Sequence, residues 1–395
     1  MENLLEGVRV LDLTRVLAGP YASMVLADLG AEVIKVELPG TGDESRGFGP
    51  FQNGESAYFT SVNRGKKSVT IDMRHQRGSA LVQRLAGSCD VLVENFRPGS
   101  MDRFGLGYAA LHARSPQLVY ASISGFGQTG PYAQRPAYDV LIQAMGGLAS
   151  ITGEPGGAPV RVGSSIGDLS AALFGAIGIL AALERARRLG EGQQIDVAML
   201  DCQVALLENA LARYAVSGEV PQPLGSRHPA ITPFQFFQAS DGHIAIAAGN
   251  DGLWRKLCTA LGLESLADDP RFGDNAQRTE NHAELEPLLG EVLAAKTVAE
   301  WCEILGAAGV PSGPLHDVGQ VFHDEQVAAR EMIVELEHPV AGRQALPNSP
   351  LKFSQTPIEL SAPAPLLGQH TEEILRGMLG LAADEIEALR GAGVI

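Results

Sequence analysis

Short apolar runs alternate with longer stretches in which apolar residues recur every three or four positions. The short runs predict buried strands, and the periodic stretches predict helices with one apolar face. The predicted strands are Val8–Asp12, Glu32–Glu37, Val69–Asp72, Asp90–Glu94, Leu118–Ser124 and Gln194–Ala198, and the predicted helices are Ala18–Leu29, Gly78–Ala86, Arg135–Gly146, Leu169–Leu183 and Met199–Val216. The chain thus opens with a βαβ unit, and its continued alternation is typical of an α/β protein.

The pattern changes after residue 217. Gly, Pro and Ser are frequent in Gly218–Pro229, which predicts a linker. The runs Phe234–Gln238 and Gly242–Ala248 predict a hairpin. The further predicted elements are helices around 253–261, 283–293 and 298–308, strands at 333–337 and 351–354, and helices at 372–379 and 383–390. We interpret the hairpin and the helices after it as a smaller second unit.

Asp168 is the candidate on which the chemistry depends. It follows Gly167 at the start of the predicted helix with Leu169, Leu173 and Ile177 at helical spacing. That helix is apolar on nearly every face, so we expect it to be buried. The free N–H groups and positive dipole end of a helix start favour an ionised carboxylate there. Asp168 is therefore either a helix N-cap or a nucleophile awaiting an electrophile, and its position leaves both open.

Motifs of other chemistries are missing. The turn between the first strand and helix, residues 12–20, lacks the G-x-G-x-x-G pattern of dinucleotide-binding proteins. We find no paired histidines at metal-ligand spacing, no P-loop and no G-x-S-x-G, and we expect no metal. Asn63–Ser68 is a local basic cluster, which suits either a solvated surface or an anionic ligand. Asn95–Gly105 follows a predicted strand at the end where open α/β sheets bind ligands.

Composition narrows the partners and the compartment. The formal charge of −16 and the absence of a basic stripe exclude a nucleic-acid partner. Four widely spaced cysteines predict reduced thiols rather than disulfides or a metal site. The N-terminal residues lack the features of a signal peptide, and the apolar run Leu169–Leu183 is shorter than the ~20 residues that span a bilayer. We therefore expect a cytoplasmic protein without a membrane partner.

Several segments, taken together and in order along essentially the whole chain, resemble the class III CoA-transferase family (CaiB/BaiF type). These segments are Gly7–Asp12, Leu29–Glu37, Val93–Gly99, Gly167–Asp168, Gly192–Gln194 and Pro365–Thr371. Gly225–Phe234 and the end of the chain are most similar to the branch that uses succinyl-CoA and dicarboxylates.

The resemblance implies a Rossmann-like large domain built from both chain ends, a smaller α+β domain between them, and an interlocked homodimer. On this basis we expect residues 1–220 and 326–395 in the large domain and 221–325 in the small one. The implied activity moves CoA from an acyl-CoA, succinyl-CoA in this branch, to a free carboxylic acid. Coenzyme A is then a substrate, and no tightly bound cofactor is expected.

The resemblance also implies roles for individual residues. Asp168 is the implied catalytic carboxylate, passing through a mixed anhydride and an aspartyl-CoA thioester. Guanidinium groups suit the phosphates of CoA. The residues implied to line the CoA path are Arg15, Val16, Leu17, Ala18, Asn95, Phe96, Arg97, Arg103, Phe104 and Tyr138, and Lys66 and Lys67 are candidates for the ribose 3′-phosphate.

The chain departs from the formyl-CoA transferase pattern of this family. Arg15 and Leu17 replace a histidine and a glutamine, and Arg227–His228 stands where a glycine-rich loop is expected. These differences argue against a formyl or oxalate substrate. We hypothesise that Arg227 or His228 meets the distal carboxylate of a dicarboxylic acid, the alternative being a linker with ordinary surface charge.

Two other functions stay open from the sequence. An α-methylacyl-CoA racemase has the same fold, but it carries a histidine at the position of Tyr138. Tyrosine, with an ordinary pKa near 10, is a poor acid–base partner at neutral pH. The other alternative is a non-catalytic module that binds CoA or a nucleotide.

Overall fold

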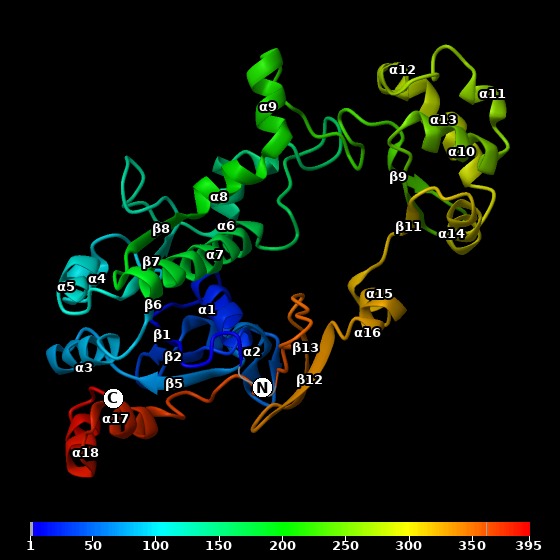
Figure 1. The fold of residues 1–395 in the computed structure, drawn as a ribbon. Helices are drawn as coiled ribbons and strands as arrows, with labels where there is room; N and C mark the ends of the chain where they lie inside the picture. The colour runs from blue at the N-terminus through cyan, green and yellow to red at the C-terminus, as the bar shows by residue number, and fades with distance from the viewer. Residues whose placement is uncertain (1–2, 361) are drawn as a thin grey trace. The chain divides into compact units, whose positions relative to one another are not determined.

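The computed structural model describes residues 3–360 and 362–395, which form two compact units (Figure 1). The first comprises Met1–Leu148, Arg161–Val216 and Gln326–Ile395, and the second Ala149–Val160 and Ser217–Glu325. The expected large domain contained 149–160 and 217–220. These residues instead pack with the second unit, where the Gly225 amide donates to the Gly153 carbonyl at 2.9 Å.

A six-stranded parallel sheet forms the centre of the first unit. The strands are β1 (Arg9–Asp12), β2 (Glu32–Glu37), β5 (Lys66–Thr70), β6 (Val91–Glu94), β7 (Val119–Ser124) and β8 (Gln194–Ala198). Their order is β5-β2-β1-β6-β7-β8, so successive connections run outward in both directions from β1 and β6. In such a doubly wound sheet the crevice beyond the carboxyl ends of the two central strands is the usual ligand site.

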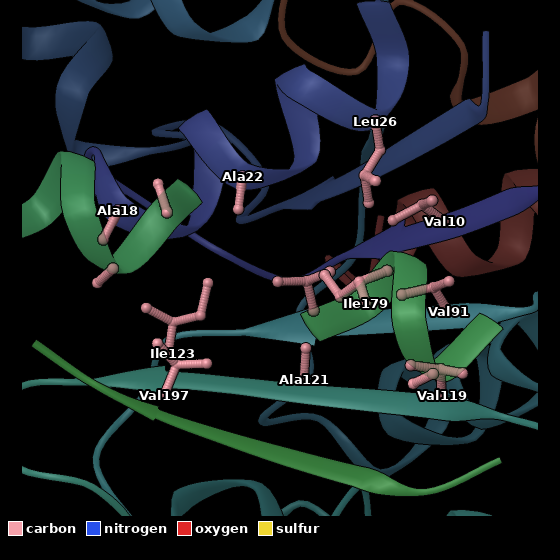
Figure 2. Packing of buried hydrophobic residues seen from close by; sticks show 14 of the residues in the cluster. Val10, Ala18, Ala22, Leu26, Val91, Val119, Ala121, Ile123, Ile179 and Val197 are labelled. Atoms are coloured by element: carbon pink, nitrogen blue, oxygen red, sulfur yellow. The ribbon is translucent and has the colours of Figure 1, made fainter. Parts of the chain in front are cut away.

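Helices cover both faces of this sheet. On one face α1 (Ala18–Asp28) packs against α7 (Ile166–Leu189), and Ala22, Leu26 and Ile179 join a core with Val10 and other strand residues (Figure 2). The opposite core contains residues of α3 (Gln76–Ala86), α17 (Thr371–Leu379) and α18 (Ala383–Gly391). Small alanine side chains on α1 and α7 let the two helices approach the sheet closely.

The C-terminal segment completes the sheet edge at β5. The Gly368 amide donates to Ser68 Oγ at 2.8 Å, and the Thr70 amide donates to Thr371 Oγ1 at 3.0 Å. The Asp72 amide donates to the Val394 carbonyl at 2.8 Å. Residues 368–394 are therefore part of the first unit's core rather than a tail.

Smaller elements complete the first unit. They are η1 (Glu44–Gly47), β3 (Phe51–Gln52), β4 (Glu55–Ser56), α2 (Ala57–Asn63), α4 (Ser100–Arg103), α5 (Tyr108–His112), α6 (Asp139–Met145), α8 (Met199–Leu206), α9 (Glu208–Ser217), β12 (Ile333–His338) and β13 (Gly342–Pro347). The expected helix 199–216 is divided at Glu208, which has φ 45°. The expected strand 351–354 does not form, because β12 pairs with β13 instead.

The second unit is built on a three-stranded antiparallel sheet. Its strands, β9 (Phe234–Gln238), β10 (His243–Ala247) and β11 (Ser312–Pro314), follow the order β11-β10-β9 and include the predicted hairpin. Its short elements are η2 (Leu148–Ser150), α11 (Glu264–Ala267), α12 (Asn275–Glu280) and α15 (Val318–Phe322). The short helix α16 (Glu325–Ala329) lies where the chain returns to the first unit, which begins again at Gln326. The longer helices α10 (Asp251–Leu261), α13 (His282–Leu293) and α14 (Val298–Ala307) supply most of its core, with Trp254 and Trp301 buried.

Helix α7 differs from its prediction in two ways. It runs for 24 residues, and among the described residues it is the one helix that is both long enough and apolar enough to cross a membrane. Half of its most apolar 18-residue stretch is buried inside the protein. Its buried residues belong to the core beside α1, which is the place of a core helix. It is not buried all round, because Leu173, Phe174 and Ile177 are 49%, 44% and 61% exposed.

Candidate functional site

A cavity of about 200 Å³ lies at the carboxyl ends of the central strands, where the sheet topology places a ligand site. It brings together residues from the β1–α1 turn, the segments after β6 and β7, and the start of α7. The lining residues are Arg15, Val16, Leu17, Ala18, Glu44, Asn95, Phe96, Arg97, Pro98, Ile123, Ser124, Gly125, Ala133, Arg135, Pro136, Ala137, Tyr138, Asp168 and Met199. Nine of these, from four separate segments, are sequence-predicted site residues.

Asp168 is in the first turn of α7 but does not cap it. The helix begins at Ile166 with Ser165 at the N-cap position, and no hydrogen bond to the Asp168 carboxylate occurs within residues 3–360 and 362–395. The N-cap explanation is therefore wrong. Burial, and then the neighbouring Asp139 carboxylate, raise the pKa of Asp168 to about 7. The expectation of a firmly ionised group is also wrong, because desolvation and a like charge outweigh the helix start.

Asp139 is a functional candidate that the sequence analysis missed. Its buried carboxylate accepts hydrogen bonds at 2.8 Å from the Gly167 amide and from Gln143 Nε2. Gln143 Oε1 in turn accepts from the Val162 amide at 2.8 Å. Helix α6 thus holds the segment that leads into Asp168. The available signal was an acidic residue directly after Tyr138 at a predicted helix start.

Arg15 lies at the rim of the cavity. Its guanidinium pairs with Glu44 at 2.6 Å and lies over the Phe96 ring, 5.0 Å from the centroid. Asn95 holds the Arg15 main chain through two hydrogen bonds, accepting from its amide at 3.0 Å and donating to its carbonyl at 2.8 Å. The β1–α1 turn and the segment after β6 are thereby joined across the two central strands.

A larger cavity of about 460 Å³ adjoins the first and shares Arg15, Glu44 and Phe96 with it. Leu13, Val36, Leu38, Ile71, Met73 and Phe104 give it apolar walls, and Arg74 and Asp72 add charge. The sequence analysis named Phe104 but missed the residues after β2 and β5. The segment after β2, which includes Leu38, Thr41 and Gly42, forms one wall.

Three predicted basic residues lie outside both sets of lining residues. Lys66 is 3% exposed and donates to Asp12 Oδ2 at 3.0 Å, and burial lowers its pKa to about 8. Lys67 pairs with Glu32 at 2.9 Å and Glu373 at 2.8 Å. Arg103 donates to Ser100 Oγ at 3.0 Å. Both lysines belong to β5, which begins three residues earlier than predicted, and their contacts are those of structural residues.

Arg227 and His228 belong to the second unit. The His228 amide donates to the Phe234 carbonyl at 3.0 Å, and His228 Nδ1 accepts from the Ala230 amide at 3.1 Å. Burial lowers the pKa of the Arg227 guanidinium. The two residues therefore lie beside β9 in an ordered turn. Across residues 3–360 and 362–395 no group of three or more His, Cys, Asp or Glu side chains is arranged to hold a metal ion.

Comparison with known proteins gives consistent relatives. The model of CoA-transferase family III matches residues 5–371. The succinyl-CoA:glutarate CoA-transferase of Mus musculus is 43% identical over 99% of this chain and 90% of its own. The acetyl-CoA:oxalate CoA-transferase of Acetobacter aceti is 43% identical over 88% and 89%. A crystal structure of a CaiB/BaiF family protein from Brucella suis superposes with a TM-score of 0.85 at 41% identity, covering 96% of this chain and all of that one.

Proposed function

Because this chain belongs to CoA-transferase family III, we propose that it moves CoA from succinyl-CoA to a free short dicarboxylic acid through Asp168. The observation that carries the proposal is the cavity at the sheet's switch point, where Asp168 lies with residues 15–18 and 95–97. Its carboxylate has no described hydrogen-bonding partner, so it is available to react. Of the two relatives compared above, the glutarate enzyme supports both the succinyl-CoA donor and a dicarboxylate acceptor. The other is named for acetyl-CoA and oxalate, and oxalate is the acceptor that the sequence departures at residues 15, 17 and 227–228 argue against.

The proposed chemistry exchanges acyl groups of similar energy, so it needs no metal or ATP. The Asp168 carboxylate attacks the succinyl-CoA carbonyl, the C–S bond breaks, and a mixed anhydride and CoA thiolate form. The thiolate then attacks the aspartyl carbonyl, which releases succinate and leaves CoA as an Asp168 thioester. The acceptor carboxylate repeats these steps in reverse and takes the CoA.

The two adjoining cavities suggest how CoA is bound. The smaller one contains Asp168 and would receive the thioester end, whereas the larger, mostly apolar one has a volume typical of sites for nucleotide-sized ligands. Arg15 borders both and is suited to the phosphates between them, as are Arg97 in the smaller cavity and Arg74 in the larger. Tyr138, 71% exposed, is available to contact the pantetheine arm.

We further propose that the working form is a homodimer, interlocked as the family resemblance implies. Leu173, Phe174 and Ile177 form an exposed apolar face on α7, and Val204 and Leu206 on α8 are also exposed. Apolar residues gathered in this way usually mark an interface.

Arg227 or His228 is proposed to bind the distal carboxylate of the acid.

The test incubates the protein with succinyl-CoA and separate dicarboxylic acids, and identifies each new acyl-CoA by mass. We expect a glutaryl- or similar dicarboxylyl-CoA with the wild type and none with Asp168→Asn. Asp201→Asn is the matched control, because Asp201 is likewise the third residue of its helix, α8, but lies outside the cavity. Hydroxylamine should inactivate the enzyme only when succinyl-CoA is present, by trapping activated Asp168.

Two outcomes would overturn the proposal. One is CoA transfer by Asp168→Asn at the wild-type rate. The other is a wild type that forms no new acyl-CoA but exchanges the α-hydrogen of a branched acyl-CoA with deuterium, which would indicate a racemase.

A further inference from the structure

The turn between β1 and α1 carries an unusual backbone conformation beside the reactive carboxylate. Val16 has φ 67°, and in the described part of the chain it is the one β-branched residue with a positive φ. A β-branched side chain is disfavoured there because its Cβ approaches the carbonyl oxygen that follows. Such strain persists only where surrounding contacts hold it, and it is concentrated at functional sites.

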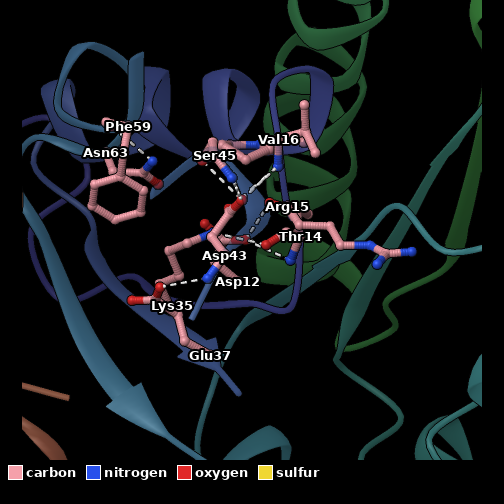
Figure 3. Close-up of polar contacts among 12 residues, drawn as sticks. Asp12, Thr14, Arg15, Val16, Lys35, Glu37, Asp43, Ser45, Phe59 and Asn63 are labelled. Atoms are coloured by element: carbon pink, nitrogen blue, oxygen red, sulfur yellow. Dashed lines mark hydrogen bonds and ion pairs between the residues drawn. The ribbon is translucent and has the colours of Figure 1, made fainter. Parts of the chain in front are cut away.

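Three consecutive amides of the turn before α1 are each held by a side chain. The Thr14 amide donates to Asp12 Oδ1 at 2.8 Å and the Arg15 amide to Asn95 Oδ1 at 3.0 Å. The strained residue is held by Asp43, whose two carboxylate oxygens lie 3.1 and 3.2 Å from the Val16 amide (Figure 3). Three separate acceptors therefore fix three consecutive amides of this turn.

Asp43 is itself held in place by Lys35 and Ser45. Lys35 Nζ pairs with Asp43 Oδ2 at 2.9 Å and also donates to the Thr14 carbonyl at 2.7 Å, with both side chains buried (Figure 3). Ser45 donates twice to Asp43 Oδ1, through its amide at 2.9 Å and its hydroxyl at 2.8 Å. Burial tends to raise the pKa of Asp43, but Lys35 and these hydrogen bonds outweigh it and lower that pKa.

The turn leads directly to the start of α1. The first main-chain hydrogen bond of α1 is donated by the Tyr21 amide to the Leu17 carbonyl at 2.8 Å. The amides of Ala18 and Gly19 have no acceptor within residues 3–360 and 362–395. Val16, Leu17 and Ala18 line the same cavity as Asp168. Gly19 is required by packing, since a Cβ there would lie 2.4 Å from the Thr14 side chain.

We propose that the buried Lys35–Asp43 pair is a positioning device for the reaction, holding Val16 in its left-handed conformation so that residues 16–18 keep their place beside Asp168. Lys35 lines neither cavity, and Asp43, which borders the larger one, acts in this proposal through the Val16 amide rather than on substrate. Negative charge develops on an acyl oxygen in each step of CoA transfer, and amides at a fixed helix start are suited to stabilise it. The kinetic part of this inference rests on the proposed function, whereas the strain at Val16 does not.

The test is a double-mutant cycle between Asp43→Asn and Val16→Gly. Glycine occupies positive φ at no steric cost, so a turn that carries Val16→Gly depends less on the Lys35–Asp43 pair. With Val16 present, we expect Asp43→Asn to lower kcat at least about tenfold and to change KM for succinyl-CoA less. In the Val16→Gly background, the loss caused by Asp43→Asn should shrink to about threefold or less.

Asp28→Asn is the matched control, because Asp28 forms another buried ion pair, with Arg64 at 2.7 Å, and touches neither the turn nor the Asp168 cavity. We expect it to lower the melting temperature but not kcat. An unchanged kcat in Asp43→Asn, or an equal loss in both backgrounds, would overturn the proposal.

A second measurement does not depend on activity or on the folding of Asp43→Asn. Alanine keeps the Cβ that is strained at positive φ whereas glycine removes it, and both variants lose the rest of the valine side chain, so Val16→Gly should melt above Val16→Ala. A lower melting temperature for Val16→Gly than for Val16→Ala would show that residue 16 is not strained and would overturn the proposal. If the wild type transfers no CoA, the proposed function fails, but this measurement still decides whether residue 16 is held in a strained conformation.

Discussion

Asp139 accepts a hydrogen bond at 2.8 Å from the amide of Gly167, the residue directly before Asp168. The contact joins the start of α6 to the start of α7, and both bear on the same cavity. It also brings two carboxylates close together, and the second-largest contribution to the raised pKa of Asp168, after burial, comes from Asp139. One residue therefore fixes the position of Asp168, the proposed nucleophile, and weakens its acidity.

We expect the pH dependence of transfer to report this pair. In the proposed mechanism only ionised Asp168 attacks, so kcat/KM should rise with pH through a midpoint near 7. Asp139→Asn removes the like charge but retains an oxygen that can accept from Gly167, so the midpoint should fall by about one unit. Asp201→Asn should leave it unchanged. The measurement is kcat/KM for succinyl-CoA from pH 5 to 9, and an unmoved midpoint in Asp139→Asn would contradict the assignment.

The same pKa predicts a stability difference. Between the ordinary pKa of aspartate and about 7, the folded protein binds more protons at Asp168 than the unfolded chain, so its stability falls as pH rises across this window. Asp168→Asn removes this loss. The variant should melt a few degrees above the wild type at pH 8, and the difference should vanish near pH 4. A thermal-melting series would contradict the prediction if the difference were independent of pH.

Lys66 and Lys67 should differ sharply despite being neighbours. Lys66→Met removes the ion-pair partner of the buried Asp12 carboxylate, which should lower the free energy of unfolding by about 3–5 kcal/mol. Lys67→Met breaks two partly exposed pairs and should cost less than about 1 kcal/mol. Denaturant unfolding measures both. Lys67→Met also tests the expected phosphate contact. Because Lys67 already pairs with Glu32 and Glu373, we expect KM for succinyl-CoA to stay unchanged, and a severalfold rise would show that Lys67 binds the ribose phosphate.

The exposed face of α7 predicts how the chain assembles. Ile177→Lys places a charge among Leu173 and Phe174, so it should convert a homodimer into monomers or insoluble protein. Val318→Lys, at an 85% exposed position of the second unit, is the control and should keep the wild-type mass. Light scattering after gel filtration measures the mass. A monomeric wild type would contradict the proposed dimer.

Local patterns predicted most of the elements of the first unit. Glu32–Glu37 and Gln194–Ala198 form strands with the predicted bounds, because apolar β-branched runs between turn residues are informative by themselves. The division of 199–216 into two helices was not predictable. It depends on the positive φ of Glu208, which no local sequence signal marks.

The site was predictable in part for a similar reason. Residues 15–18, 95–97, 138 and 168 follow strands or begin helices, and a doubly wound sheet brings such positions to one edge. Lys66 was a ligand candidate through the family resemblance and its place in a local basic cluster. Its contact with Asp12, 54 positions earlier, is tertiary and left no pattern in the sequence. Asp43 was missed likewise, because its partners Val16 and Lys35 lie in other elements.

The closure of β5 by residues 368–371 bears on how a ribosome makes this protein. Ser68 and Thr70 find their partners 300 and 301 positions later in the chain. Contacts of such long range form slowly, and during synthesis they cannot form before the whole second unit has emerged. A nascent chain therefore carries the edge of β5 without these partners for most of its translation.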